Sequence, residues 1–319
     1  MGHDHRTVSV HTARHEPLPL VALCVTLLSW SCGYPVIRMA LLYFSPAGLS
    51  ALRYALAATL IMTWAACTRP ALPRLADLPR FALCGGVGIA LYTILFNMGE
   101  QSVTAGAASL LLNISPLLTA IIAVVFMREK LPLAGWVGSG LSFLGVAIIG
   151  GGQPGGFSFG SGASCILAAA LCTALYYVLQ KPLIGRYGPL PTTAWILMCG
   201  AVALLPWLPG AIREAQGHGM TPWILMLVLA IFPSVVGYAA WAHVVGRMGV
   251  ARSAGFLYLD APTVLVMAYF MLGEVPSLPT LLGGAVVMGG VLVAQLFGRM
   301  PSRRKKHKAD SDVSVIDGS

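Results

Sequence analysis

Two ionisable side chains lie within stretches of this sequence that are otherwise apolar. Asp260 lies in the middle of a stretch over Val250–Leu272, and Arg53 lies in another over Pro46–Ala66. If both stretches cross a membrane as helices, an ionised side chain at the centre costs about 2.5–3.5 kcal/mol, so such residues usually have a function. We therefore expect Asp260, near the midplane, to bind a proton or a cationic group, with Arg53 as its ionic partner in one state.

A structural role is the alternative for both residues. Asp260 and Arg53 could form a static pair, or burial could keep Asp260 neutral. Arg53 could instead extend along its helix to reach the polar headgroups. The residue types alone leave these alternatives open.

Aromatic rings and hydrogen-bonding groups recur in the same apolar stretches. Such groups suit an amphipathic solute in a largely apolar cavity. Packing is the alternative for each, because Trp and Tyr near helix ends often anchor a helix at the membrane interface. The candidate residues for lining a cavity are Trp30, Tyr34, Tyr92, Asn97, Asn113, Tyr176, Tyr238, His243 and Tyr258.

Patterns for catalysis, metal binding and nucleotide hydrolysis are missing. The sequence has no HExxH motif and no GxxxxGK[ST] loop. Its seven cysteines form no CxxC pair, and the histidines at positions 3 to 15 lie in a polar segment without fixed geometry. We expect no catalytic residue, no metal and no cofactor.

The elements that position these residues are membrane helices. Only 10% of the 319 residues are charged and 57% are hydrophobic, whereas about a quarter of a soluble domain is charged. A helix of about 20 apolar residues crosses the hydrocarbon layer, and its backbone satisfies its own hydrogen bonds. We therefore predict an all-α membrane protein with ten transmembrane helices, near Leu18–Leu42, Pro46–Ala66, Leu78–Gly99, Val103–Met127, Pro132–Gly150, Gly162–Gln180, Pro191–Leu208, Pro222–Gly246, Val250–Leu272 and Leu278–Gly298.

Basic residues predict the orientation of these helices. With the N-terminus inside, most of the 20 Lys and Arg residues fall in cytoplasmic loops or in the C-terminal tail, as cytoplasmic segments require. Both termini are therefore predicted to be cytoplasmic, in a multi-pass protein of the cell inner membrane. The net charge of +9 lies beside a membrane, so nucleic acid is not an expected partner.

The two halves of the chain resemble each other at a constant offset. Tyr92 corresponds to Tyr238, Asn97 to His243 and Pro116 to Pro262, while Asn113 falls near the position equivalent to Asp260. A five-helix unit duplicated in tandem inserts its second copy upside down, and inverted repeats of this kind are a recurrent transporter architecture. The predicted organisation is a cytoplasmic tail over 1–17, a first repeat over 18–150, an external linker over 151–160, a second repeat over 161–298 and a basic cytoplasmic tail over 299–319.

Several motifs resemble those of the drug/metabolite transporter superfamily, specifically its ten-helix EamA-type permeases. The segment from Trp30 to Arg38 resembles the opening motif of the family, and Leu49 to Tyr54 resembles its arginine motif. The Pro-to-Glu spacing of the family is matched twice, by Pro116 with Glu129 and by Pro262 with Glu274. Cys199 departs from the pattern, because symmetry would place a partner of Arg53 there. The resemblance implies transport of amino acids, metabolites or amphipathic compounds by alternating access.

We expect a secondary transporter that exports a small amphipathic metabolite or amino acid. A membrane-embedded lipid-modifying enzyme and a non-transporting scaffold are the alternatives. The expected partners are a small-molecule substrate and the bilayer, while proton coupling and a homodimer are left open. Small residues predict close helix packing between the halves or between two copies. They are Ala134, Gly138, Ser142, Ala285 and Gly289.

Overall fold

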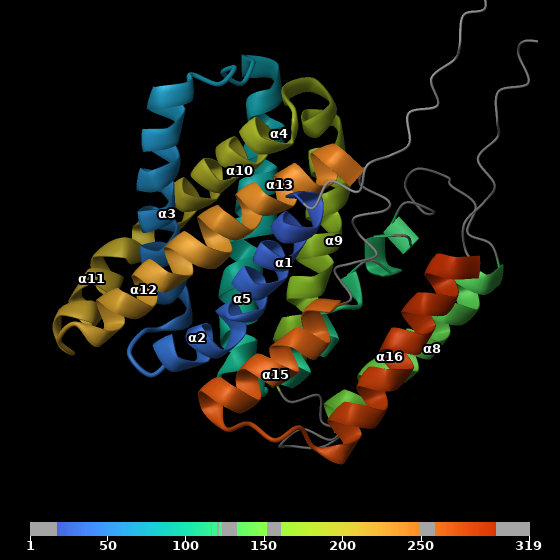
Figure 1. Cartoon of the computed structure of the whole chain (residues 1–319). Coiled ribbons are helices and arrows are strands. Elements are labelled where there is room, and N and C mark those ends of the chain that lie inside the picture. The colour runs from blue at the N-terminus through green and yellow to red at the C-terminus, as the bar shows by residue number, and fades with distance from the viewer. Residues whose placement is uncertain are drawn as a thin grey trace, which may run out of the picture.

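The computed structural model describes residues 18–115, 117–119, 121–122, 133–151, 161–248 and 259–297. The tails over 1–17 and 299–319 and most of the linker, 152–160, lie outside these ranges. Every regular element in the described part is helical, which confirms the predicted all-α class (Figure 1). Six helical stretches in that part are long and apolar enough to cross a membrane, namely Leu20–Ala40, Pro46–Thr68, Leu75–Glu100, Ser161–Tyr187, Pro189–Gln216 and Thr221–Trp241.

The first half begins with a span that is broken at Cys32. The side chains of Ser45 and Thr104 accept hydrogen bonds from the backbone of Gly48 and Ala107, so each caps the helix that follows it. The elements are α1 (Leu18–Ser31), α2 (Gly33–Ala40), α3 (Pro46–Thr68), η1 (Leu75–Asp77), α4 (Leu78–Gly85), η2 (Gly86–Leu91), α5 (Tyr92–Glu100), α6 (Ala105–Leu112) and α8 (Leu133–Gly151).

The second half also consists of helices. Its elements are α9 (Ser161–Tyr187), α10 (Pro189–Leu204), η3 (Leu205–Trp207), α11 (Leu208–Gln216), α12 (Thr221–Ile231), η4 (Phe232–Val236), α13 (Gly237–Met248), α15 (Asp260–Leu272) and α16 (Leu278–Phe297).

The predicted span over Val250–Leu272 is described from Leu259 onward. Asp260 is the first residue of α15, and Leu259 before it also has helical backbone angles. The part of the predicted span before Leu259 lies outside the described residues, so the midplane position of Asp260 stays a prediction.

Helices of the two halves interlock. The first span of each half packs against the third span of the other, so α1 contacts α13 and α9 contacts α5. The π-helical segments η2 and η4 occupy equivalent positions in these third spans; η2 ends directly before Tyr92, and η4 ends two residues before Tyr238. Segments of this kind are rare and occur frequently at functional sites.

Glycines allow the backbones of α8 and α16 to pack closely. A Cβ added to Gly145 would lie 2.6 Å from the carbonyl oxygen of Gly283, and one added to Gly290 would lie 2.6 Å from that of Gly138. The Ser142 hydroxyl donates to the carbonyl of Val287 at 3.1 Å. The predicted packing of small residues between the halves is thus confirmed at Gly138 and Ser142. Figure 1 shows this helix pair at one side of the bundle, and it contacts α6.

Candidate functional site

The carboxylate of Asp260 faces the break between α1 and α2. The hydroxyl of Ser31, the last residue of α1, donates to Oδ1 of Asp260 at 2.7 Å. The Tyr34 side chain, in α2, interacts with the same carboxylate. The Ser31 hydroxyl is thus a neutral hydrogen-bond donor to Asp260, whose charge has no ionic partner in the described part of the chain.

Arg53 is buried, with 8% of its surface exposed. Its Nε donates to Oγ of Ser234 in η4 at 2.9 Å, and its guanidinium lies 5.1 Å from the centre of the Tyr54 ring, within range of a cation–π contact. The alternative in which Arg53 extends outward to the headgroups is therefore wrong for this structure.

Asp260 and Arg53 form no ion pair with each other among the described residues. Both interact electrostatically with Cys32, the residue at the helix break. A static pair does not exist in this state. Two opposite charges thus remain unpaired with each other inside the protein.

Several tyrosines lie within electrostatic range of one or both charges. Tyr92 interacts electrostatically with Arg53 and Tyr177, and Tyr177 interacts with Asp260. Tyr238 interacts with Arg53 and with Tyr176. We call this set the tyrosine cluster; it comprises Tyr34, Tyr54, Tyr92, Tyr176, Tyr177 and Tyr238.

Trp30 and Tyr176 occupy equivalent positions in the first span of each half. Each ring packs against the π-helical region of the other half. The Trp30 indole donates to the carbonyl of Pro233 at 3.1 Å and lies edge-on to Tyr238 with ring centres 5.5 Å apart. A Cβ added to Gly88 would lie 2.5 Å from the Tyr176 ring, and one added to Gly237 would lie 2.6 Å from Trp30. Glycine at both positions therefore permits the close approach of these rings.

The remaining candidates lie in other surroundings. Asn97 is fully buried and donates to the carbonyl of Pro46 at 3.1 Å and to Ser50 at 2.9 Å, so it joins α5 to the start of α3. Asn113 donates to a carbonyl of its own helix. His243 is half-buried on α13, and its Nε2 has no hydrogen-bond partner among the described residues. Tyr258, Pro116 and Glu129 lie outside the described residues.

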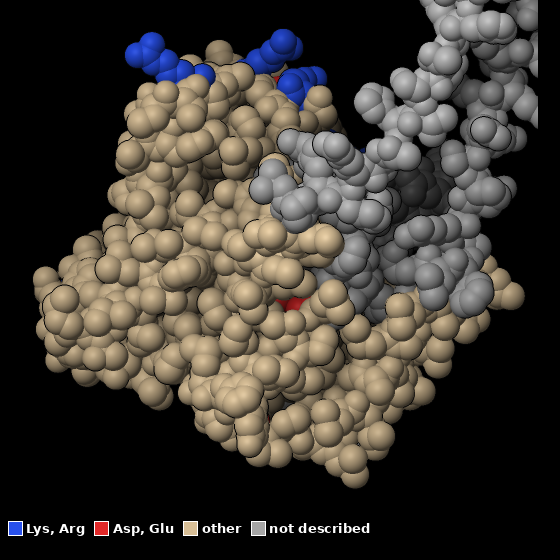
Figure 2. Space-filling model, in the orientation of Figure 1, with Lys and Arg blue, Asp and Glu red and all other residues tan. Residues whose placement is uncertain are grey.

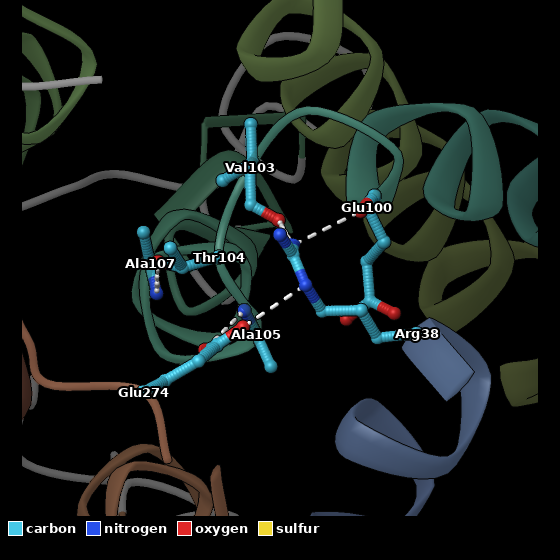
Figure 3. Close-up of polar contacts among 7 residues, drawn as sticks. All are labelled: Arg38, Glu100, Val103, Thr104, Ala105, Ala107 and Glu274. Atoms are coloured by element: carbon cyan, nitrogen blue, oxygen red, sulfur yellow. Dashed lines mark hydrogen bonds and ion pairs between the residues drawn. The ribbon is translucent and has the colours of Figure 1, made fainter. Parts of the chain in front are cut away.

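A second polar group lies where α2, α5 and α6 meet the end of α15 (Figure 3). Nε of Arg38 lies 3.0 Å from Oε1 of Glu274, and Nη1 of Arg38 donates to the carbonyls of Glu100 and Val103. Oε2 of Glu274 accepts a hydrogen bond from the backbone N–H of Ala105 at 3.0 Å. Because Glu274 belongs to the second half and its partners to the first, we call this contact the Arg38–Glu274 clasp.

The opposite end of the molecule carries a different contact between the halves. Nη1 of Arg186 donates to both carboxylate oxygens of Asp77, at 2.7 and 2.6 Å, and the Tyr187 hydroxyl donates to Oδ2 at 2.6 Å. Exposed basic residues surround it, including Arg69, Arg74, Arg80 and Lys181. Figure 2 shows the basic side chains of the visible face gathered at this end, above the α3–α4 connection.

Some of these residues were recognisable in the sequence and others were not. Arg38 and Glu274 belong to the motifs that carry the family resemblance, and the structure brings them together. Ser31 and Ser234 were missed, because a serine in an apolar stretch resembles any small packing residue. Tyr176 was among the predicted candidates, and Tyr177 lies directly beside it in the sequence.

Comparison with known proteins places this chain among transporters. The model of the EamA-like transporter family matches residues 18–151 and again 160–295. A probable terminal-alkyne amino-acid exporter from Streptantibioticus cattleyicolor is 36% identical over 273 residues, covering 85% of this chain and 91% of that protein. An uncharacterised transporter from Bacillus subtilis is 34% identical over 268 residues, covering 84% of this chain and 87% of that protein.

Two more distant matches extend the comparison. A probable amino-acid metabolite efflux pump from Salmonella typhimurium is 26% identical over 293 residues, covering 87% of this chain and 94% of that protein. A protein of known crystal structure superposes with a TM-score of 0.56 at 17% identity, covering 88% of this chain and 98% of that chain. The latter match supports the overall fold.

Proposed function

The chain belongs to the EamA-like transporter family, and from this premise we propose that it exports a small amino acid or a related amphipathic metabolite across the cell inner membrane. The duplicated match agrees with the two interlocked halves of the bundle. Export is supported by the names of two relatives, an amino-acid exporter and an amino-acid metabolite efflux pump.

The observation that carries this proposal is the pair of separated opposite charges. An amino acid bears one carboxylate and one ammonium group. The Arg53 guanidinium suits the carboxylate, because it can donate two parallel hydrogen bonds and its bond to Ser234 uses only Nε. Asp260 suits the ammonium group of the solute. That group would supply the ionic partner that the Asp260 carboxylate lacks.

The tyrosine cluster supports recognition of the rest of the solute. Its rings offer apolar surface to a side chain and π faces to an ammonium group, and its hydroxyls offer hydrogen bonds. Trp30 and Tyr176 would form two walls from equivalent positions of the halves, together with Tyr34, Tyr92 and Tyr238. A phosphorylated solute fits poorly, since a single buried arginine would have to bind a doubly charged group.

The proposed architecture has ten helices in two inverted repeats, over 18–150 and 161–298, with an external linker over 151–160 and both termini cytoplasmic. The gathering of basic residues around Asp77 and Arg186 supports a cytoplasmic location for that end. The Arg38–Glu274 clasp then lies at the external end. Transport proceeds by alternating access, in which the halves rock about the site between them.

Flux from proteoliposomes tests this function with substrates matched to each charge. The solutes are radiolabelled amino acids, their amides, which lack the carboxylate, and their N-acetyl derivatives, which lack the ammonium group. Arg53→Gln should reduce flux of the amino acid about tenfold or more, the equivalent of 1.4 kcal/mol, and should affect the amide much less. Asp260→Asn should show the reverse selectivity, sparing the N-acetyl derivative.

Arg80→Gln, an exposed residue at the basic end, is the matched control and should retain full flux. Flux of the amino acid at the normal rate in both Arg53→Gln and Asp260→Asn would overturn the proposed binding roles. No flux of any solute through the folded wild-type protein would favour the enzyme or scaffold alternatives.

A further inference from the structure

Glu100, the last residue of α5, has a buried side chain that the proposed transport mechanism does not use. Only 1% of its surface is exposed, and neither Oε1 nor Oε2 has a hydrogen-bond partner among the described residues. Its backbone carbonyl accepts from Arg38, and Figure 3 draws no contact to its carboxyl oxygens. An ionised carboxylate in such surroundings is far more costly than a neutral carboxyl group.

Among the described residues no ion pair joins Glu100 to any of the charged groups around it. Glu100 interacts electrostatically with Arg38 on α2, with Arg53 on α3 and with Glu274 at the end of α15. Nε of Arg38 is already paired with Glu274, and Arg53 is bonded to Ser234.

The other groups facing Glu100 are neutral. Tyr34 on α2 and Tyr92 on its own helix interact with it, while α6 and α9, which also pack against α5, contribute no such group among their described residues. Around the clasp there are thus two acids for one available arginine.

We propose that Glu100 binds a proton and that this proton holds the Arg38–Glu274 clasp closed. With Glu100 neutral, Arg38 and Glu274 balance each other. When Glu100 loses its proton, a second carboxylate competes for Arg38, and the link from Glu274 to α2 weakens. The only bond that forms or breaks is the O–H bond of the Glu100 carboxyl group, and the proton passes to or from water.

The transport consequence rests on the proposed function and its topology. Opening of the clasp separates the end of α15 from α2 and from the start of α6, where Glu274 also binds the N–H of Ala105. If this end is external, a proton taken from the external water closes it after solute release, and loss of that proton from Glu100 allows it to reopen.

A distance measurement tests the clasp without any solute. Spin labels at Leu42→Cys, after α2, and Val275→Cys, beside Glu274, report the separation of the two halves, since both positions are exposed. The full chain, with its seven native cysteines replaced, is reconstituted in nanodiscs. The labels should be close at acidic pH and should separate as the pH rises.

Glu100→Gln, which imitates the protonated acid, should keep the labels close at every pH. Glu214→Gln is the matched control, because Glu214 is a partly buried acid at the same end that binds the backbone of Ser45. In Glu214→Gln the two labels should separate as the pH rises, as they do in the parent chain. A pH-dependent separation that persists in Glu100→Gln would overturn the proposal, as would labels that never separate in the parent chain.

Infrared difference spectra between the two pH values give a direct second measurement. The band of a protonated carboxyl group should be present in the parent chain and in Glu214→Gln, and lost in Glu100→Gln. An unchanged band in Glu100→Gln would show that another acid binds the proton and would overturn the assignment. Neither measurement needs a substrate, so failure of the proposed amino-acid export would leave both results interpretable.

Discussion

The two ends of the molecule join the halves by the same pair of chemical groups, but in opposite electrostatic conditions. At the basic end, Asp77 accepts hydrogen bonds from Arg186 and Tyr187, and the side chains of Arg186 and Asp77 are 51% and 11% exposed. At the other end, the side chains of Arg38 and Glu274 are 32% and 16% exposed, and Glu100 adds a buried acid without a partner among the described residues. The first contact is balanced and its arginine is half-exposed, whereas the second has one acid too many.

This difference indicates which of the two contacts can respond to a change in protonation. An exposed ion pair exchanges readily for contacts with water and contributes little to stability. A buried cluster with one excess acid changes its stability strongly when that acid gains or loses a proton, because no water is present to solvate the charge. The basic end can therefore open and close at little cost, while the clasp end changes state with a single proton.

The largest effect is expected from Arg38→Gln. Removal of the only cation of the clasp leaves Glu274 and Glu100 together without a countercharge. We expect a loss of about 3 kcal/mol of stability, the low end for breaking a buried pair, because about a third of Arg38 is exposed. Thermal unfolding in detergent measures it, and adding Glu100→Gln to this variant should recover part of the loss. Equal stability of the single and double variants would show that Glu100 does not belong to the clasp.

A smaller effect is expected from Glu100→Gln alone. Because the amide carries no charge, the variant should match the parent chain at acidic pH and exceed its stability by about 1–3 kcal/mol at alkaline pH, where the unpartnered carboxyl would otherwise ionise. Unfolding curves across a pH series measure this difference. A variant less stable than the parent at alkaline pH would contradict the reasoning.

The smallest effect is expected from Asp77→Asn at the basic end. Since solvent screens this contact, the melting temperature should change little, and added salt should weaken the Asp77–Arg186 contact more than the clasp. Cross-linking of paired cysteines placed at each end, measured at low and high salt, compares the two. If Asp77→Asn lost as much stability as Arg38→Gln, the contacts at the two ends would not differ as proposed.

Much of the fold was predictable from the sequence, because long apolar stretches can satisfy their backbone only as helices in lipid. The break at Cys32 has a signal in the sequence, because Pro35 has no N–H to donate to the carbonyl of Ser31, four residues earlier. Arg53 and Asp260 stood out because charge is costly in a membrane. The serines that bind them lie in different halves: Ser234, which binds Arg53, is in η4, and Ser31, which binds Asp260, is in α1.

The sequence by itself determined the membrane class, the family and the repeat, because these follow from composition and from matches between segments of one chain. Only the tertiary structure decided which residues meet. Trp30 and Tyr176 each contact the opposite half, Asn97 donates to the start of α3, and Glu100 is buried beside Arg38. Glu100 follows an apolar stretch at the edge of a short loop, where an acid would ordinarily be hydrated. Its burial arises from the packing of α2, α6 and α9 around the end of α5, and a linear pattern does not encode that packing.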